Sequence, residues 1–154
     1  MLAGALGHGL KAVVVQFIKG CSDTGEEAFF RVSPKLKWHV MGEGFTWETQ
    51  DAERDLLTAR AACALVFTFL QDESIDLIIL DDFTYALKYG WLSTDEVKTA
   101  LSNRPEMQHV VITGRGAPQP LIDIADTVSE INLVKHAYQA GVQAMWVLSF
   151  NITH

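Results

Sequence analysis

The chain has 154 residues, of which 49% are hydrophobic and 20% are charged, so it is long enough for one domain with a real core and too short for two comfortable ones. Its formal net charge of -7 argues against a general nucleic-acid binder, which normally has a basic face, and no apolar run approaches the roughly 20 residues that a membrane span needs. Two widely separated cysteines and the absence of a basic-then-apolar leader predict a cytoplasmic protein with reduced thiols.

The first half of the chain predicts one short helix, one long helix and two strands. Residues 1–9 are typical of the last turns of a helix that glycine closes. Apolar, β-branched runs predict strands over 11–18 and 36–40, with a short segment at 26–31 between them. Residues 51–72 predict the long helix, because apolar residues recur there at steps of four and three. This stripe consists of Ala52, Leu56, Ala59, Cys63, Val66 and Leu70.

The second half is organised around residues 74–87, whose apolar run is hydrophobic on both faces, as in a strand buried between helices of a parallel sheet. Ser93 and Glu96 form a capping box that marks the start of a helix. The other predicted elements are helices at 83–89, 93–103 and 118–125 and strands at 109–113, 127–133 and 143–150. Strands that alternate with helices predict an α/β fold with a mostly parallel sheet flanked by helices.

Two adjacent acids, Asp81 and Asp82, end the apolar run. Ligands of parallel sheets bind outside the carboxyl ends of the strands, where acids commonly hold Mg²⁺ beside nucleotide phosphates. This is the Walker B pattern. An acid at the end of a buried strand is also often only a helix cap, so both interpretations stay open at this point.

Arg115 lies between two glycines directly after the strand at 109–113. Glycines let a backbone approach a ligand, and a guanidinium group binds phosphate in a bidentate way, although a plain turn with a solvated arginine has the same sequence. The five histidines are scattered, with no pair at metal-binding spacing, and no nucleophile elbow or Cys–His pair stands out. The catalytic candidates are therefore acids, a lysine and an arginine at strand ends, a set suited to phosphate and Mg²⁺.

A glycine-bracketed loop at 41–50 carries two large aromatic residues, Phe45 and Trp47. Either these rings anchor the loop on the core, or they offer a hydrophobic face to a flat ligand. Several segments then occur together in one order: VVVQFIKG (13–20), GFTWETQ (44–50), LIILDDFTYAL (77–87), ALSNRP (100–105), VVITGRG (110–116), ADTVSE (125–130) and VKHAYQAGV (134–142). In this combination, which covers nearly the whole chain, the sequence resembles the ATP:corrinoid adenosyltransferase family of the P-loop class.

The resemblance implies a RecA-like P-loop NTPase fold and a defined reaction. Family members transfer the 5′-deoxyadenosyl group of ATP to the Co(I) of a corrinoid and release triphosphate. The implied cofactors and partners are ATP, Mg²⁺ and the corrinoid, with a flavoprotein or other reductant that brings cobalt to the Co(I) state. A homodimer is implied as well. No nucleic acid and no membrane are expected among the partners, because the net charge is -7 and no apolar run is long enough for a span.

The resemblance also implies roles for individual residues. Phe45 and Trp47 would cover the lower face of the corrin ring and displace its lower axial ligand, since apolar groups offer cobalt no lone pair. Asp81 and Asp82 would hold Mg²⁺ beside the phosphates, and Asp82 would also be a catalytic residue. The catalytic guanidinium of Arg115 would face the triphosphate.

Gln16 and Lys19, at the end of the strand nearest the predicted site, are further candidates for cofactor contacts. The family usually has Asp-Glu where this chain has Asp81 and Asp82. Because aspartate is one methylene shorter than glutamate, this difference puts the mode of Mg²⁺ contact in question.

The family pattern begins with a strand and a Gly-rich Walker A loop, G-x-G-K-G-K-T-T, and no such loop occurs in these 154 residues. The expectation is therefore a single domain over 1–154 that is shortened at its N-terminus relative to the family and lacks the first strand and P-loop. One alternative function is a non-catalytic corrinoid-binding or interaction remnant without nucleotide binding. A third alternative is a Mg²⁺-dependent P-loop phosphotransferase, but the GFTW segment (44–47) would have no role in such an enzyme.

Overall fold

A computed structural model of the chain describes residues 1–17, 24–41, 52–136 and 141, and it divides the chain into two units, Met1–Ile124 and Ala125–His154. The helices are α1 (Leu2–Gly7), α2 (Gly25–Phe30), α3 (Ala52–Leu70), α4 (Thr84–Lys88), α5 (Thr94–Ser102) and α6 (Gln119–Ile122). The strands are β1 (Ala12–Gln16), β2 (Leu36–Val40), β3 (Leu77–Asp81) and β4 (His109–Ile112).

The four strands form one all-parallel sheet in the order β2-β1-β3-β4, which confirms the predicted α/β class. The apolar runs explain the central places of β1 and β3, because a strand that is hydrophobic on both faces is stable only where both faces are covered. The crossovers between parallel strands use helices, as the alternation of predicted elements indicates.

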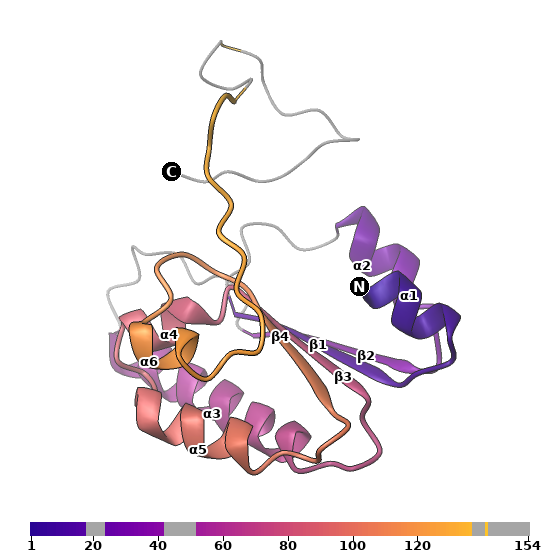
Figure 1. Cartoon of the computed structure of the whole chain (residues 1–154), viewed down its shortest axis with the longest axis horizontal. Coiled ribbons are helices and arrows are strands. Elements are labelled where there is room, and N and C mark those ends of the chain that lie inside the picture. The colour runs from indigo at the N-terminus through magenta and orange to yellow at the C-terminus, as the bar shows by residue number, and fades with distance from the viewer. Residues whose placement is uncertain (18–23, 42–51, 137–140, 142–154) are drawn as a thin grey trace. The chain divides into compact units, whose positions relative to one another are not determined.

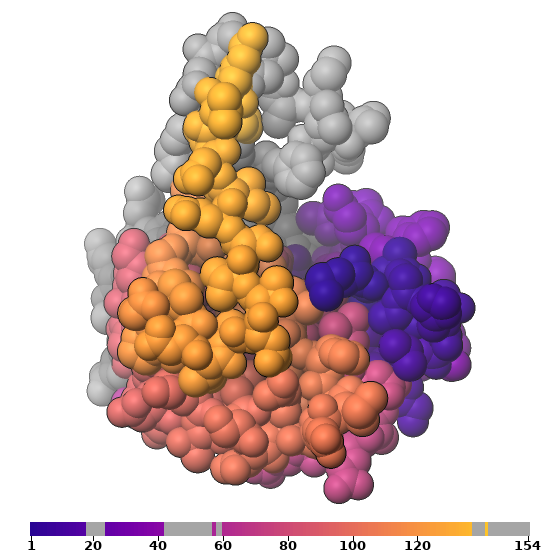
Figure 2. Space-filling model, in the orientation of Figure 1, coloured from indigo at the N-terminus to yellow at the C-terminus, as the bar shows by residue number. Residues whose placement is uncertain are grey.

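Alternate residues of the central strands face two different layers. Val13, Val15, Ile78 and Leu80 belong to the main hydrophobic core together with residues of α3 and α5. Figure 1 shows α3 and α5 side by side on that face of the sheet, and α1 and α2 on the other. In Figure 2, atoms of α1 and α2 gather on one side of the visible face and those of α5 and α6 on the other.

Local signals set several helix ends. The predicted capping box of α5 is present, with the Ser93 hydroxyl accepting from the Glu96 amide and the Glu96 carboxylate accepting from the Ser93 amide. At the start of α2, the Thr24 hydroxyl accepts from the amide of Glu27. After α1, Gly9 adopts a positive φ of 80°, which a residue without Cβ tolerates and which lets the chain turn into β1.

The prediction of a strand over 127–133 is wrong, since this part of the chain has no regular secondary structure. A strand needs a neighbour to take up its backbone hydrogen bonds, and an apolar run by itself does not specify one. Its apolar side chains are exposed, Ile131 to 96%. The strand predicted at 143–150 lies outside the described residues. Within the described part of the chain, no helix is long and apolar enough to cross a membrane.

Candidate active site at the carboxyl edge of the sheet

The register of the sheet brings polar residues together at the carboxyl ends of the strands. Gln16, the last residue of β1, is paired with Asp81, the last residue of β3. Leu80 is paired with Ile112 at the end of β4, so the next residue, Thr113, lies beside Asp81. Three neighbouring strands thus each deliver one polar side chain to the same edge, where parallel sheets bind their ligands.

Both carboxylate oxygens of Asp81 accept hydrogen bonds from neighbouring strand ends. The Gln16 side-chain amide donates to Oδ2 at 3.3 Å, and the Thr113 hydroxyl donates to Oδ1 at 2.7 Å. The same Thr113 oxygen accepts from the backbone amide of Asp82 at 3.0 Å. These contacts fix the plane of the Asp81 carboxylate, while each oxygen keeps a further lone pair for a ligand.

Asp82 has an unusual backbone conformation, because its φ of 56° lies in the left-handed region. Residues with a Cβ are uncommon there, although aspartate and asparagine are the side chains that tolerate it best. Burial raises the pKa of Asp82, the charge of Asp81 adds to this effect, and the charge of Arg115 opposes it. Strain and a perturbed acid at one position are typical of functional sites.

The loop after β4 is held against the start of α4. The Thr84 hydroxyl donates to the backbone carbonyl of Arg115 at 3.2 Å. Gly114, with a φ of 145°, packs so closely that an added Cβ would overlap the Thr84 hydroxyl. Glycine is therefore required at 114. The next side chain, Arg115, is exposed and lies near enough to Asp82 for its charge to act on the pKa of that acid.

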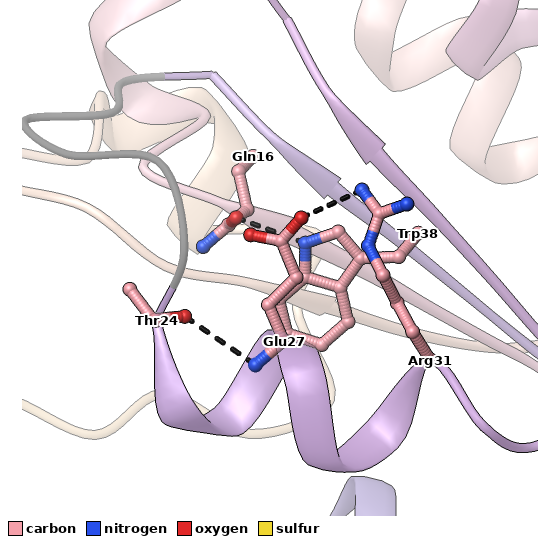
Figure 3. A network of polar contacts seen from close by, with 5 residues as sticks. All are labelled: Gln16, Thr24, Glu27, Arg31 and Trp38. Carbon is pink, nitrogen blue, oxygen red and sulfur yellow. Dashed lines mark hydrogen bonds and ion pairs between the residues drawn. The ribbon is translucent and has the colours of Figure 1, made fainter.

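On the side of β1 that faces α2, a second network orients Gln16. The Trp38 indole N–H donates to Gln16 Oε1 at 3.0 Å, so the Gln16 amide group must present its N–H atoms in the other direction. Beside these residues, Glu27 is buried and pairs with Arg31 at 2.6 Å, while its backbone amide donates to Thr24 (Figure 3). The glutamine is thus fixed by a neighbouring strand rather than left to rotate.

The structure brings four of the predicted site residues to one edge: Gln16, Asp81, Asp82 and Arg115. The other predicted site residues, Lys19, Phe45 and Trp47, lie outside the described residues. Sequence reasoning missed Thr113, Thr84 and Trp38. A signal existed for Thr113 alone, since it is the first polar residue after a predicted strand.

The described residues fit a magnesium site that the protein completes only in part. The carboxylates of Asp81 and Asp82 are hard oxygen donors, and Mg²⁺ is commonly bound by one or two carboxylates while it keeps waters and substrate phosphate oxygens. Within the described residues, no group of three or more His, Cys, Asp and Glu side chains gathers, so a closed site made of protein ligands alone is not formed there.

The chain is similar to known proteins over most of its length. The family model described as ATP:corrinoid adenosyltransferase BtuR/CobO/CobP matches residues 1–150. A Corrinoid adenosyltransferase of Pseudomonas aeruginosa is 54% identical over 97% of this chain and 74% of its own length. One of Escherichia coli K12 is 44% identical over 91% of this chain and 71% of its own. The Corrinoid adenosyltransferase CobA of Salmonella typhimurium is 43% identical, with 96% and 75% covered.

Proposed function

This chain belongs to the ATP:corrinoid adenosyltransferase family, and from that premise we propose that it transfers the 5′-deoxyadenosyl group of ATP to the cobalt of a corrinoid. In this reaction Co(I) attacks the C5′ carbon of ATP, a cobalt–carbon bond forms, and the bond from C5′ to the triphosphate oxygen breaks. The observation that carries the proposal is the fixed Asp81 carboxylate beside Asp82 and Arg115 in a chain that matches the family over residues 1–150.

Asp81 and Asp82 are the residues that would hold Mg²⁺. When bound, the ion would neutralise charge on the triphosphate leaving group. Arg115 would contribute to the same effect directly, because a guanidinium group binds phosphate oxygens bidentately and stabilises charge that develops during the reaction. Gln16 would be one of the contacts that orient the Asp81 carboxylate for this task.

Phe45 and Trp47 would cover the lower face of the corrin ring in this proposal, with Lys19 near the nucleotide. Apolar rings offer cobalt no lone pair, so the lower axial ligand is lost and Co(II) becomes easier to reduce. A flavoprotein or another reductant would supply the electron. The proposal also includes a homodimer that acts in the cytoplasm.

The decisive experiment mixes the purified chain with ATP, Mg²⁺ and chemically generated cob(I)alamin and follows the visible spectrum. We expect adenosylcobalamin to form, and Asp81→Asn to slow its formation by about a hundredfold, because a displaced metal removes much of the charge stabilisation. Asp95→Asn, an exposed acid at the start of α5, is the matched control and should leave the rate unchanged. Corrinoid binding without ATP binding or product would favour the non-catalytic remnant instead.

Trp47→Ala tests the role proposed for the aromatic loop. We expect this change to lower the rate with Co(II) under a reducing system far more than the rate with pre-formed Co(I), because only the reduction step depends on loss of the axial ligand. The measurement is the ratio of the two rates in wild type and variant. Equal losses in both assays would count against ligand displacement.

A further inference from the structure

We propose that Thr113 is a positioning residue, whose hydroxyl holds Asp81 and Asp82 in the relative orientation that a divalent cation needs. This inference rests on the proposed function and deepens it, because it concerns how the cation site of that reaction is built. Thr113 itself is not assigned a place among the metal ligands. Its role is to act through the two acids.

The two hydrogen bonds of the Thr113 hydroxyl have opposite polarity. Its single proton is committed to Asp81 Oδ1 at 2.7 Å, which leaves a lone pair to accept the Asp82 amide proton at 3.0 Å. Because a hydroxyl has only one proton, the first bond orients the oxygen for the second. One atom therefore links the side chain of the first acid to the backbone of the next.

Each acid needs this support for a different reason. The Asp81 carboxylate would rotate if only the longer contact from Gln16, at 3.3 Å, held it. Asp82 has a left-handed backbone with a φ of 56°, a conformation that persists only where the surroundings impose it. The bond from the Asp82 amide to Thr113 is one such constraint, and it sets the direction in which the Asp82 side chain leaves the turn.

Thr113 can do this because its own backbone is anchored. Its amide donates to the carbonyl of Leu80 at 3.0 Å, which extends the ladder between β3 and β4 by one residue beyond Ile112. A group fixed on a strand is held more precisely than one on a free loop. The hydroxyl is also on the residue before Gly114, whose close packing on Thr84 fixes the following turn.

The alternative is that Thr113 only stabilises the turn, with no effect on a cation. Mn²⁺ separates the two readings, because its binding can be followed by electron paramagnetic resonance of the free ion in the presence of ATP, without any turnover, once the Mn²⁺ that ATP binds in a protein-free blank is subtracted. The variants are Thr113→Val, which keeps the shape and removes the hydroxyl, and Thr113→Ser, which keeps the hydroxyl. Thr99→Val is the matched control, since the Thr99 hydroxyl donates to the Asp95 carbonyl within α5.

Thr113→Val is expected to weaken Mn²⁺ binding about tenfold, the size of effect typical of a lost hydrogen bond to a charged group. The Mn²⁺ affinity of Thr113→Ser should stay within about threefold of the wild-type value, and that of Thr99→Val should equal the wild-type value. Unchanged binding in Thr113→Val overturns the proposal, and so does an equal loss in Thr113→Ser. If Thr113→Val does not unfold cooperatively, Thr113→Ala replaces it with the same expected result.

A wild-type chain that binds no Mn²⁺ with ATP would also overturn this inference. The proposed function is judged separately, by formation of adenosylcobalamin from Co(I). The two failures are therefore distinguishable. If the wild-type chain forms adenosylcobalamin and Thr113→Val binds Mn²⁺ normally, the positioning role alone is rejected. If Thr113→Val binds Mn²⁺ more weakly but the wild-type chain forms no product, the reaction alone is rejected.

Discussion

The imidazole of His39 lies in β2 on the face of the sheet that packs against α3, where its ring centroid is 5.2 Å from that of Phe69. Its Nε2 atom is buried and has no hydrogen-bond partner among the residues that the structure describes. Burial lowers the pKa of His39 from its usual 6.5, and the charges of Lys37 and Arg31 lower it further. The folded protein therefore binds this proton less tightly than the unfolded chain does.

This shift predicts a pH dependence of stability. Below about pH 6.5 the unfolded state takes up the proton first, so the free energy of unfolding falls as the pH falls and is fully recovered above that value. His39→Phe keeps a ring against Phe69 and removes the titration, so its unfolding free energy should fall less steeply than that of wild type. Urea unfolding over a pH series measures both slopes, and parallel curves would contradict the prediction.

Gly114→Ala tests the fit between the loop after β4 and the start of α4. An added Cβ overlaps the Thr84 hydroxyl and forces a φ of 145° on a residue that rarely adopts it, so we expect a loss of about 2 kcal/mol or more in the free energy of unfolding and weaker triphosphate binding through Arg115. Gly116→Ala, at a φ of 67° with open space around it, is the control and should cost only about 1 kcal/mol. Equal costs would show that backbone strain alone matters.

Among the helices and strands, the C-terminal end of α3 is held by a buried side chain from another part of the chain, Gln108. It is only 3% exposed, and its amide nitrogen lies 3.1, 3.1 and 3.2 Å from the carbonyl oxygens of Phe69, Asp72 and Ile75, which share its two N–H protons. These carbonyls belong to the last turn of the helix and the chain that leaves it, where intrahelical partners run out. The carbonyls of Phe69 and Asp72 also accept backbone amides of this turn, so the Gln108 amide gives each of them a second donor. One side chain before β4 thus ties the end of α3 to the sheet.

Gln108→Ala should lower the free energy of unfolding by about 1–3 kcal/mol, because the Ile75 carbonyl loses its side-chain donor and the carbonyls of Phe69 and Asp72 each lose one of two donors. Gln108→Glu has nearly the same shape but offers oxygens where a donor is needed, so it should be at least as damaging at neutral pH. Gln119→Ala is the control, since that amide bonds only to exposed Asp123 and should change stability by less than about 0.5 kcal/mol. Denaturant unfolding of the three variants would refute the capping role if all were alike.

The sequence predicted the positions of helices and strands better than it predicted which segments pair with each other. Apolar runs located β1, β3 and β4, and a capping box located α5, because these signals are local. The segment 127–133 has similar apolar residues but is not a strand, since strand formation depends on a neighbour that the sequence does not name. For the same reason Asp81 and Arg115 were predictable as strand-end residues, whereas the bond from Thr113 to Asp81 follows from the register between β3 and β4.

At the scale of the whole molecule, the described hydrophobic core is confined to the first unit. The core cluster begins at Val13 and ends at Leu121, which α6 contributes. All four strands and all six described helices also belong to Met1–Ile124. The candidate site is part of the same unit, because Gln16, Asp81 and Thr113 are strand-end residues of its sheet. The cooperative folding unit should therefore be this part of the chain.

A variant that ends at Ile124 should accordingly still unfold cooperatively, with a melting temperature within about 5 °C of the full chain. A second variant that ends at Ala117 loses α6 and with it Leu121, which is 7% exposed. Removal of a buried leucine costs about 2–5 kcal/mol, so this shorter variant should melt well below the first. Circular dichroism during heating measures both transitions. If the variant that ends at Ile124 melts as low as the shorter one, or without a cooperative transition, then residues after Ile124 are needed for the core, and the sheet with its strand-end acids is not an independent folding unit.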